Sequence, residues 1–269
     1  MNDRATVEAT ADVLIAARRD GRALTGFPGA TPGDMTESYR IQEAAIARWS
    51  DDLVGWKIGY IATDRRKPGE PDRLVGPIWS SGCHRSDAPP VEAGIFADGF
   101  AAVEAEFVVR LDQDLPEHEG AWTAAEVAQL DQQLLVGIEV ASSPIPDINT
   151  LGPTVIAADF GNNNGLLIGP ELADHAGVVL ACVIDSELVG EGTADNLPGG
   201  LHHGLATALD LLADRGHSVR SGTLFATGAI TGIHPIRPGQ HCRVEVRDRS
   251  SKNEGPSLEL RTVDLGQPS

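Results

Sequence analysis

Two glutamates, Glu104 and Glu106, lie two residues apart in an apolar stretch that runs from residue 103 to residue 109. The stretch is rich in valine, which favours β-strands, and alternate residues of a strand point to the same face. The two carboxylates therefore project side by side, where they repel each other and are costly to bury. A divalent cation relieves both problems, because carboxylate oxygens are preferred ligands of Mg²⁺ and Mn²⁺. The alternative is an edge strand whose glutamates face water.

A third glutamate, Glu139, lies in a second apolar stretch over residues 137–140. Strand alternation places Gly137 on the same face, and this small residue leaves room beside the carboxylate. Mg²⁺ is often bound by a few carboxylates that leave positions open for water and substrate. The three glutamates together predict a Mg²⁺ or Mn²⁺ site, although Glu139 alone would also fit a strand residue exposed to water.

Lysine is rare in this chain, which has three lysines against 18 arginines. Lys57 lies between Trp56 and Ile58 and has a glycine on either side of that trio. Apolar neighbours lower the pKa of an ammonium group by removing water, whereas nearby carboxylates raise it. Lys57 is therefore a candidate for moving protons or holding an anionic substrate. The alternative is a strand lysine that extends its charge to water.

Two polar turn segments supply candidate substrate-binding groups. Residues 158–165 contain Asp159 and Asn163, and residues 226–232 contain Thr227. Amides, hydroxyls and backbone N–H groups of such turns can bind a carboxylate. Asparagine and glycine also provide the positive-φ positions that turns require, so a purely structural role is the alternative.

The composition argues against several classes of protein. The net charge of −18 disfavours binding to nucleic acid and to anionic membrane surfaces. No apolar run approaches the ~20 residues needed to cross a bilayer, and the N-terminus lacks a signal-peptide pattern, so we expect a cytoplasmic protein. The three cysteines form no C-x-x-C pair. The sequence contains no nucleophile elbow, P-loop or dinucleotide-binding glycine motif.

The elements that must position these residues are predicted from apolar spacing and turn signals. Helical spacing predicts helices over residues 6–19, 32–49 and 201–215, and a capping box at Thr123 predicts another to about Leu134. Polar residues 62–75 predict a surface loop. Strands or β-type segments are expected at residues 53–60, 98–112, 134–141, 166–168, 178–187, 222–227, 241–247 and 258–263. The pattern predicts an α+β fold, with a small N-terminal helical subdomain over residues 1–52 and a β-rich domain over residues 53–269.

Five motifs occur in an order that resembles one family. They are Gly55–Gly59, Glu70–Asp72 with Gly76–Ile78 downstream, Val103–Phe107, Gly137–Val140 and Ala158-Asp159. From the second predicted helix to about Gly239, the chain resembles the 2-keto-4-pentenoate hydratase and 4-oxalocrotonate decarboxylase branch of the fumarylacetoacetate hydrolase superfamily. The resemblance implies the mixed-sheet core of the fumarylacetoacetate hydrolase C-terminal type. It also implies homo-oligomers, a Mg²⁺ or Mn²⁺ site at Glu104, Glu106 and Glu139, and Lys57 and Asp72 as catalytic groups.

The resemblance also implies an activity. We expect a metal-dependent lyase that acts on a small anionic 2-oxo or 2-hydroxydienoic acid, first of all a hydratase in the catabolism of aromatic meta-cleavage products. The alternatives are a decarboxylase of a 4-oxalocrotonate-like acid, a C–C hydrolase of an acylpyruvate, and a non-catalytic protein that binds a small acid.

The chain departs from the family pattern at three places. The family usually has an Asp-Ser-Arg-like sequence after the third glutamate, and residues 141–144 read Ala-Ser-Ser-Pro. A typical Asp-Asn-Ala-Ser-Ser-Gly is Asp-Phe-Gly-Asn-Asn-Asn at residues 159–164, and a late Thr-Gly-Ser is Thr-Gly-Ala at residues 227–229. These changes spare the three glutamates and fall on segments expected to select the substrate and reaction.

Overall fold

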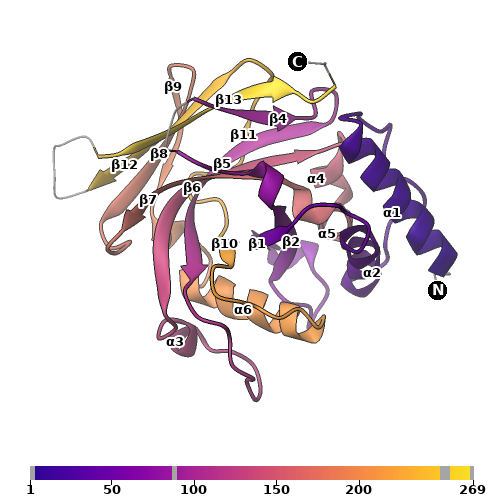
Figure 1. The fold of residues 1–269 in the computed structure, drawn as a ribbon, viewed down its shortest axis with the longest axis horizontal. Coiled ribbons are helices and arrows are strands. Elements are labelled where there is room, and N and C mark those ends of the chain that lie inside the picture. The colour runs from indigo at the N-terminus through magenta and orange to yellow at the C-terminus, as the bar shows by residue number, and fades with distance from the viewer. Residues whose placement is uncertain (1–3, 87–89, 249–254, 267–269) are drawn as a thin grey trace.

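Two mixed β-sheets form the body of the protein (Figure 1). The computed structural model describes residues 4–86, 90–248 and 255–266. The larger sheet has the order β2-β1-β10-β5-β6-β7-β3, with β11 paired to β5, and the smaller sheet has the order β4-β13-β12-β8-β9. The β1/β10, β3/β7 and β4/β13 pairs are parallel, and the remaining pairs are antiparallel.

The strands of the larger sheet are β1 (Leu53–Tyr60), β2 (Arg73–Trp79), β3 (Cys83–Arg85), β5 (Phe100–Leu111), β6 (Gln132–Ser143), β7 (Asn163–Leu172), β10 (Leu224–Ala226) and β11 (His234–Pro235). Those of the smaller sheet are β4 (Val91–Ile95), β8 (Val178–Ile184), β9 (Glu187–Gly192), β12 (His241–Asp248) and β13 (Ser257–Asp264). The α-helices are α1 (Arg4–Arg19), α2 (Met35–Ile46), α3 (Ala124–Val127), α4 (Ile148–Leu151), α5 (Pro153–Ala158) and α6 (Leu201–Asp214).

The two longest strands, β5 and β6, pair along their whole length and organise the core. Val103, Ala105 and Phe107 of β5 point to one face, where they join residues of β6, the smaller sheet and α6 in the main apolar core. The intervening residues, including Glu104 and Glu106, point to the opposite face. The two-residue alternation of the sequence thus separates the apolar core from the acidic face.

The helices α1 and α2 pack together beside α4 and α5, at one side of the larger sheet (Figure 1). Leu14, Ile15 and Ile41 of the N-terminal helices share an apolar cluster with Ile145 and Phe160. These helices therefore bury their apolar faces against later parts of the chain, and the division at residue 52 stays a prediction. No helix in the described ranges is long and apolar enough to cross a membrane.

Several elements differ from the sequence prediction. The helix that begins after Thr123 ends at Val127, because the chain enters β6 at Gln132 and pairs with β5. The predicted loop over residues 62–75 is wrong at its end, since the buried strand β2 begins at Arg73. The segment after β6, for which no helix was predicted, contains α4 and α5. The helix α2 starts later than predicted, with Asp34 as its N-cap.

Candidate metal centre

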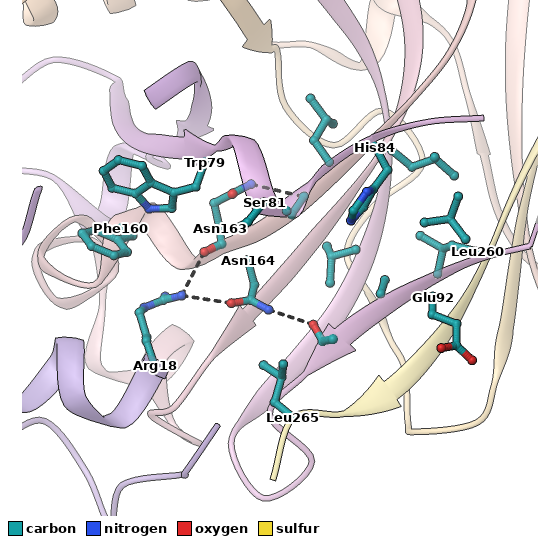
Figure 2. A pocket seen from close by; sticks show the side chains of 18 of the residues that line it. Arg18, Trp79, Ser81, His84, Glu92, Phe160, Asn163, Asn164, Leu260 and Leu265 are labelled. Carbon is teal, nitrogen blue, oxygen red and sulfur yellow. Dashed lines mark hydrogen bonds between the residues drawn. The ribbon is translucent and has the colours of Figure 1, made fainter. Parts of the chain in front are cut away.

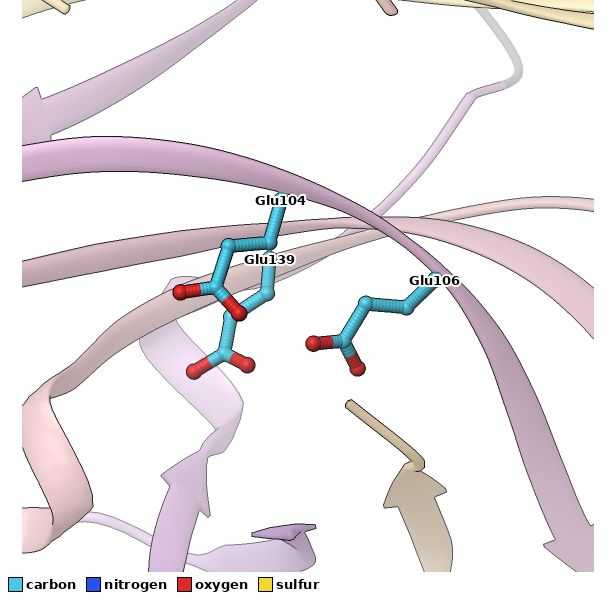
Figure 3. Close-up of side chains that lie close together, drawn as sticks. All are labelled: Glu104, Glu106 and Glu139. Atoms are coloured by element: carbon cyan, nitrogen blue, oxygen red, sulfur yellow. The ribbon is translucent and has the colours of Figure 1, made fainter. Parts of the chain in front are cut away.

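The structure brings together Glu104, Glu106 and Glu139. One carboxylate oxygen from each lies within 4.8 Å of the others, and the three side chains converge in Figure 3. Strand register explains this: Glu104 lies opposite Glu139, and Glu106 lies opposite Gly137. The residues are almost fully buried, with exposed fractions of 6%, 0% and 0%. Gly137 is needed here because a Cβ at this position would lie 2.6 Å from Val108 Cγ2.

The carboxylate oxygens of the triad are only partly satisfied by the protein. The backbone N–H of Gly228 donates to Glu106 Oε2 at 3.0 Å, and Asn163 Nδ2 donates to Glu139 Oε1 at 2.9 Å. Glu106 Oε1 and Glu139 Oε2 are buried and have no hydrogen-bond partner among the described residues. Buried oxygens of this kind are costly unless something binds them. Converging carboxylate oxygens with free lone pairs fit a hard divalent cation.

The electrostatics of the triad favour protonation when no cation is bound. Burial raises the pKa of Glu104 to about 7; the charge of Glu139 adds to this rise and that of Lys57 opposes it. Burial, together with the charges of Glu139 and Glu104, raises the pKa of Glu106 well above its usual range. The protein therefore brings three acids into a space where they cannot all ionise without a counter-charge.

Lys57 supplies part of that counter-charge. Its Nζ lies 3.6 Å from Glu139 Oε1, and its side chain is 8% exposed. Burial alone would lower the pKa of Lys57, but the three carboxylates outweigh it, and the pKa is raised. The buried Lys57 is therefore held in its charged form beside the triad.

A cavity of about 310 Å³ opens beside these charges. Lys57, Glu104 and Thr227, which the sequence singled out, all line it. Thr227 donates its hydroxyl hydrogen to the Phe107 carbonyl at 2.9 Å, so the lone pairs of its Oγ1 remain available as acceptors. The cavity is also lined by polar residues that the sequence did not single out as site residues: Arg73, Asn149, Asn162 and Asn196.

Asn162 is the most informative of these additional residues. It is 5% exposed, and its Oδ1 has no hydrogen-bond partner among the described residues. Phe160, Gly161 and Asn162 have φ values of 54°, 64° and 66°, a left-handed turn that lies against Gly76 in β2. The asparagine-rich run was a signal in the sequence, but only this turn determines which amide lines the cavity.

Three predicted site residues lie elsewhere. Asp72 contacts Arg73 Nη1 at 2.9 Å and His203 Nε2 at 3.3 Å, and it does not line the cavity. Asp159 is also outside it, since its carboxylate binds Arg18. Asn163 donates a hydrogen bond to Glu139 of the triad and does not line the cavity. Their predicted roles in catalysis and substrate binding stay predictions.

A second cavity, of about 320 Å³, lies near the first but contains none of the three glutamates (Figure 2). Arg18, Asn163 and Asn164 border it together with Trp79 and Phe160. Asn163 therefore borders this second cavity and also donates a hydrogen bond to the metal centre.

Comparison with known structures defines the class of fold. The chain superposes on a fumarylacetoacetate hydrolase family protein of yeast with a TM-score of 0.53 and 13% identity, over 79% of this chain and 94% of that one. It superposes more closely on the 4-oxalocrotonate decarboxylase of Pseudomonas putida G7 complexed with magnesium and adipate. There the TM-score is 0.81 with 19% identity, over 98% of this chain and 99% of that one. The chain therefore has the α+β fold that the sequence predicted.

Sequence comparison points to one branch of this class. The chain is 29% identical over 239 residues to a 4-oxalocrotonate decarboxylase of a Pseudomonas species, covering 85% of this chain and 88% of that protein. No family model matches the chain. The resemblance to the hydratase and decarboxylase branch of the fumarylacetoacetate hydrolase superfamily is confirmed. The decarboxylase of Pseudomonas putida G7 is complexed with magnesium, and in this chain the buried acidic triad could hold such an ion.

Proposed function

We propose that the chain is a Mg²⁺-dependent decarboxylase of a small 2-oxo dicarboxylic acid of the 4-oxalocrotonate type. The observation that carries this proposal is the buried triad of glutamates with Lys57 beside it, since Lys57 and Glu104 line the same cavity. The similarity in sequence to a 4-oxalocrotonate decarboxylase supports the choice of reaction.

Glu104, Glu106 and Glu139 would hold the cation, with Glu106 Oε1 and Glu139 Oε2 as the oxygens that the protein leaves free. When bound, the cation would act as a Lewis acid that stabilises negative charge on the 2-oxo acid end of the substrate. Asn163 and the backbone N–H of Gly228 fix the orientation of two of the carboxylates. Such supporting hydrogen bonds tune affinity and geometry.

Lys57 would donate the proton that decarboxylation requires. In decarboxylation the bond to the leaving carboxylate breaks, CO₂ departs, and the electron pair moves through the conjugated system toward the C2 oxygen. A proton taken up at the carbon or oxygen end completes the product. The protonated Nζ of Lys57, 3.6 Å from Glu139, is placed to stabilise this charge and to donate that proton.

Two polar residues of the cavity lining support a dicarboxylic substrate. Arg73 and Asn162 are both among the residues that line the cavity, and the Asn162 amide has an unsatisfied oxygen. Because an amide can rotate to present its N–H₂ group, Asn162 and the Arg73 guanidinium would both donate to a second carboxylate. Asp72, which contacts Arg73, would keep that guanidinium in place. Thr227 would offer a further polar contact to the substrate.

Hydration of a 2-hydroxydienoic acid, the reaction expected first from the sequence, is the second candidate. Ile156, Leu197 and Ile233 also line the cavity, and they would accept the apolar end of a monocarboxylic substrate. Both reactions develop negative charge at the same 2-oxo acid end, so the triad serves either one.

The test supplies the purified chain with Mg²⁺ and either 4-oxalocrotonate or 2-hydroxypenta-2,4-dienoate. Release of CO₂ from the first acid, lost in Glu106→Ala, is the expected result. Loss of dienoate absorbance without CO₂ release from 4-oxalocrotonate would mean that the chain is a hydratase and not a decarboxylase. Turnover of neither acid, with Mg²⁺ bound, would refute both and favour a non-catalytic acid-binding protein.

We further propose that the chain works as a homo-oligomer in the breakdown of aromatic ring-cleavage products. Both parts rest on the family resemblance of the sequence motifs, which the similarity to a 4-oxalocrotonate decarboxylase supports. Light scattering of the purified chain tests the oligomeric state directly, and a monomer at all concentrations would contradict it.

A further inference from the structure

The N-terminal helix α1 reaches the metal centre through one buried side chain. Arg18, near the end of α1, forms a two-point ion pair with Asp159, with Nε–Oδ1 and Nη2–Oδ2 distances of 2.7 and 2.8 Å. Their side chains are 4% and 1% exposed. Planar, two-point pairing between guanidinium and carboxylate is the strongest and most directional form of this contact.

The same guanidinium also binds the other end of the segment over residues 159–164. Its Nη1 donates to the Asn163 carbonyl at 3.1 Å and to Asn164 Oδ1 at 3.2 Å, as Figure 2 shows. Its Nη2 donates to the Asp159 carbonyl at 3.1 Å. Arg18 therefore holds the first and last parts of this segment at once.

The segment over residues 159–164, which Arg18 holds, supplies two side-chain amides to the site. The Asn163 side chain donates to Glu139 Oε1 and so leaves Oε2 as the free oxygen. Asn162 lines the substrate cavity, at the end of a left-handed turn that includes the non-glycine residue Phe160. Such backbone conformations persist only where the surrounding structure holds them.

The guanidinium that binds Asp159 comes from a distant part of the sequence. The family pattern has an arginine shortly after the third glutamate, and this chain has Pro144 in that region. Its neighbour Ser143 donates its hydroxyl hydrogen to Asp159 Oδ2 at 2.6 Å. In this chain the positive charge that faces Asp159 comes from α1, across 141 residues of sequence.

We propose that Arg18 is a positioning residue of the metal centre: through Asp159 and the Asn163 carbonyl it fixes the Asn163 amide on Glu139, and tight binding of a divalent cation depends on it. The inference rests on the proposed function only in taking the triad as the cation site. The helix α1 thereby contributes to the metal centre.

The first test measures Mn²⁺ binding to the metal-free full chain by calorimetry. Arg18→Lys keeps the charge but loses the planar fork of donors, so the segment loses its multi-point anchor. We expect Mn²⁺ affinity to fall about 10–100-fold, the usual effect of losing a residue that orients a metal ligand. Arg19→Lys, an exposed substitution in the same helix, is the matched control and keeps wild-type affinity.

Two further variants separate positioning from a general loss of structure. Asn163→Ala keeps the carbonyl that Arg18 binds but removes the amide that holds Glu139, and its Mn²⁺ affinity falls by a similar factor. In Arg18→Ala, guanidinium ion in solution restores Mn²⁺ affinity, whereas methylammonium does not. Circular dichroism establishes which variants fold. If the Arg18 variants do not fold, the Mn²⁺ affinity of Asn163→Ala tests the inference.

Wild-type Mn²⁺ affinity in folded Arg18→Lys, or in Asn163→Ala, would overturn the inference. Failure of the wild type to decarboxylate any acid while it binds Mn²⁺ would refute the proposed function and leave the role of Arg18 intact. Failure of the wild type to bind Mn²⁺ would refute both.

Discussion

The protonation of Glu104 makes the free energy of unfolding of the metal-free protein depend on pH. In the folded state burial raises the pKa of this residue from its ordinary value of 4.5 to about 7. The folded protein therefore keeps a proton that the unfolded chain releases, across the range between these two values. Raising the pH from 5 to 8 in the absence of metal is the perturbation that exposes this difference.

The magnitude follows from the two pKa values. At about 1.4 kcal/mol per pKa unit, the rise from 4.5 to about 7 corresponds to about 3 kcal/mol. Because the pKa is raised on folding, this stabilisation is fully present below pH 4.5 and is lost as the pH rises through about 7. A bound divalent cation removes the loss, since it takes the place of the proton and binds the ionised carboxylates.

Urea unfolding at steps from pH 5 to pH 8 measures this effect, on protein treated with chelator and on protein saturated with Mg²⁺. The control is Glu104→Gln, which carries no titrating group at this position. We expect the free energy of unfolding of metal-free wild type to fall with pH relative to Glu104→Gln, by up to about 3 kcal/mol. Mg²⁺ affinity should rise over the same range. Identical pH profiles for the two proteins, or Mg²⁺ affinity independent of pH, would refute the reasoning.

Three further substitutions probe the site. Glu106→Ala removes a fully buried carboxylate that we propose as a ligand, and it should abolish Mg²⁺ binding in calorimetry. Lys57→Met should bind Mn²⁺ at least as tightly as wild type, because it removes a cation beside the triad, but should lower turnover about 10²–10⁴-fold; undiminished turnover would exclude Lys57 from catalysis. Gly76→Ala places a Cβ 2.2 Å from the Phe160 carbonyl oxygen, so we expect a loss of about 1–3 kcal/mol in thermal unfolding and weaker substrate binding near Asn162. A wild-type unfolding temperature for Gly76→Ala would mean that the turn over residues 160–162 shifts at no cost in stability.

Much of the acidic face could be predicted because it depends on neighbours in the sequence. Side chains two residues apart in a strand share a face, so the spacing of Glu104 and Glu106 already placed their carboxylates together. The same rule paired Gly137 with Glu139, and the structure shows why glycine is needed there. Lys57 was noticeable for its apolar neighbours alone, and it lies on the same cavity.

Local rules failed where long-range pairing competed with them. The capping box at Thr123 was predicted to start a helix that continues to Leu134, and it does start a helix. That helix stops at Val127 because residues from Gln132 onward gain a complete ladder of hydrogen bonds with β5. Arg73 likewise looked like part of a charged loop, yet it is buried in β2 and paired with Asp72.

The sequence by itself determined which residues could bind a cation, because charge type and strand alternation are properties of a few adjacent residues. The tertiary structure alone decided how that centre is held. Arg18 meets the Asn163 carbonyl across 145 residues of sequence, and Asn162 faces the cavity through a turn pressed against Gly76. Such contacts depend on the packing of α1 and β2 against the segment before β7, and no spacing within the sequence encodes that packing.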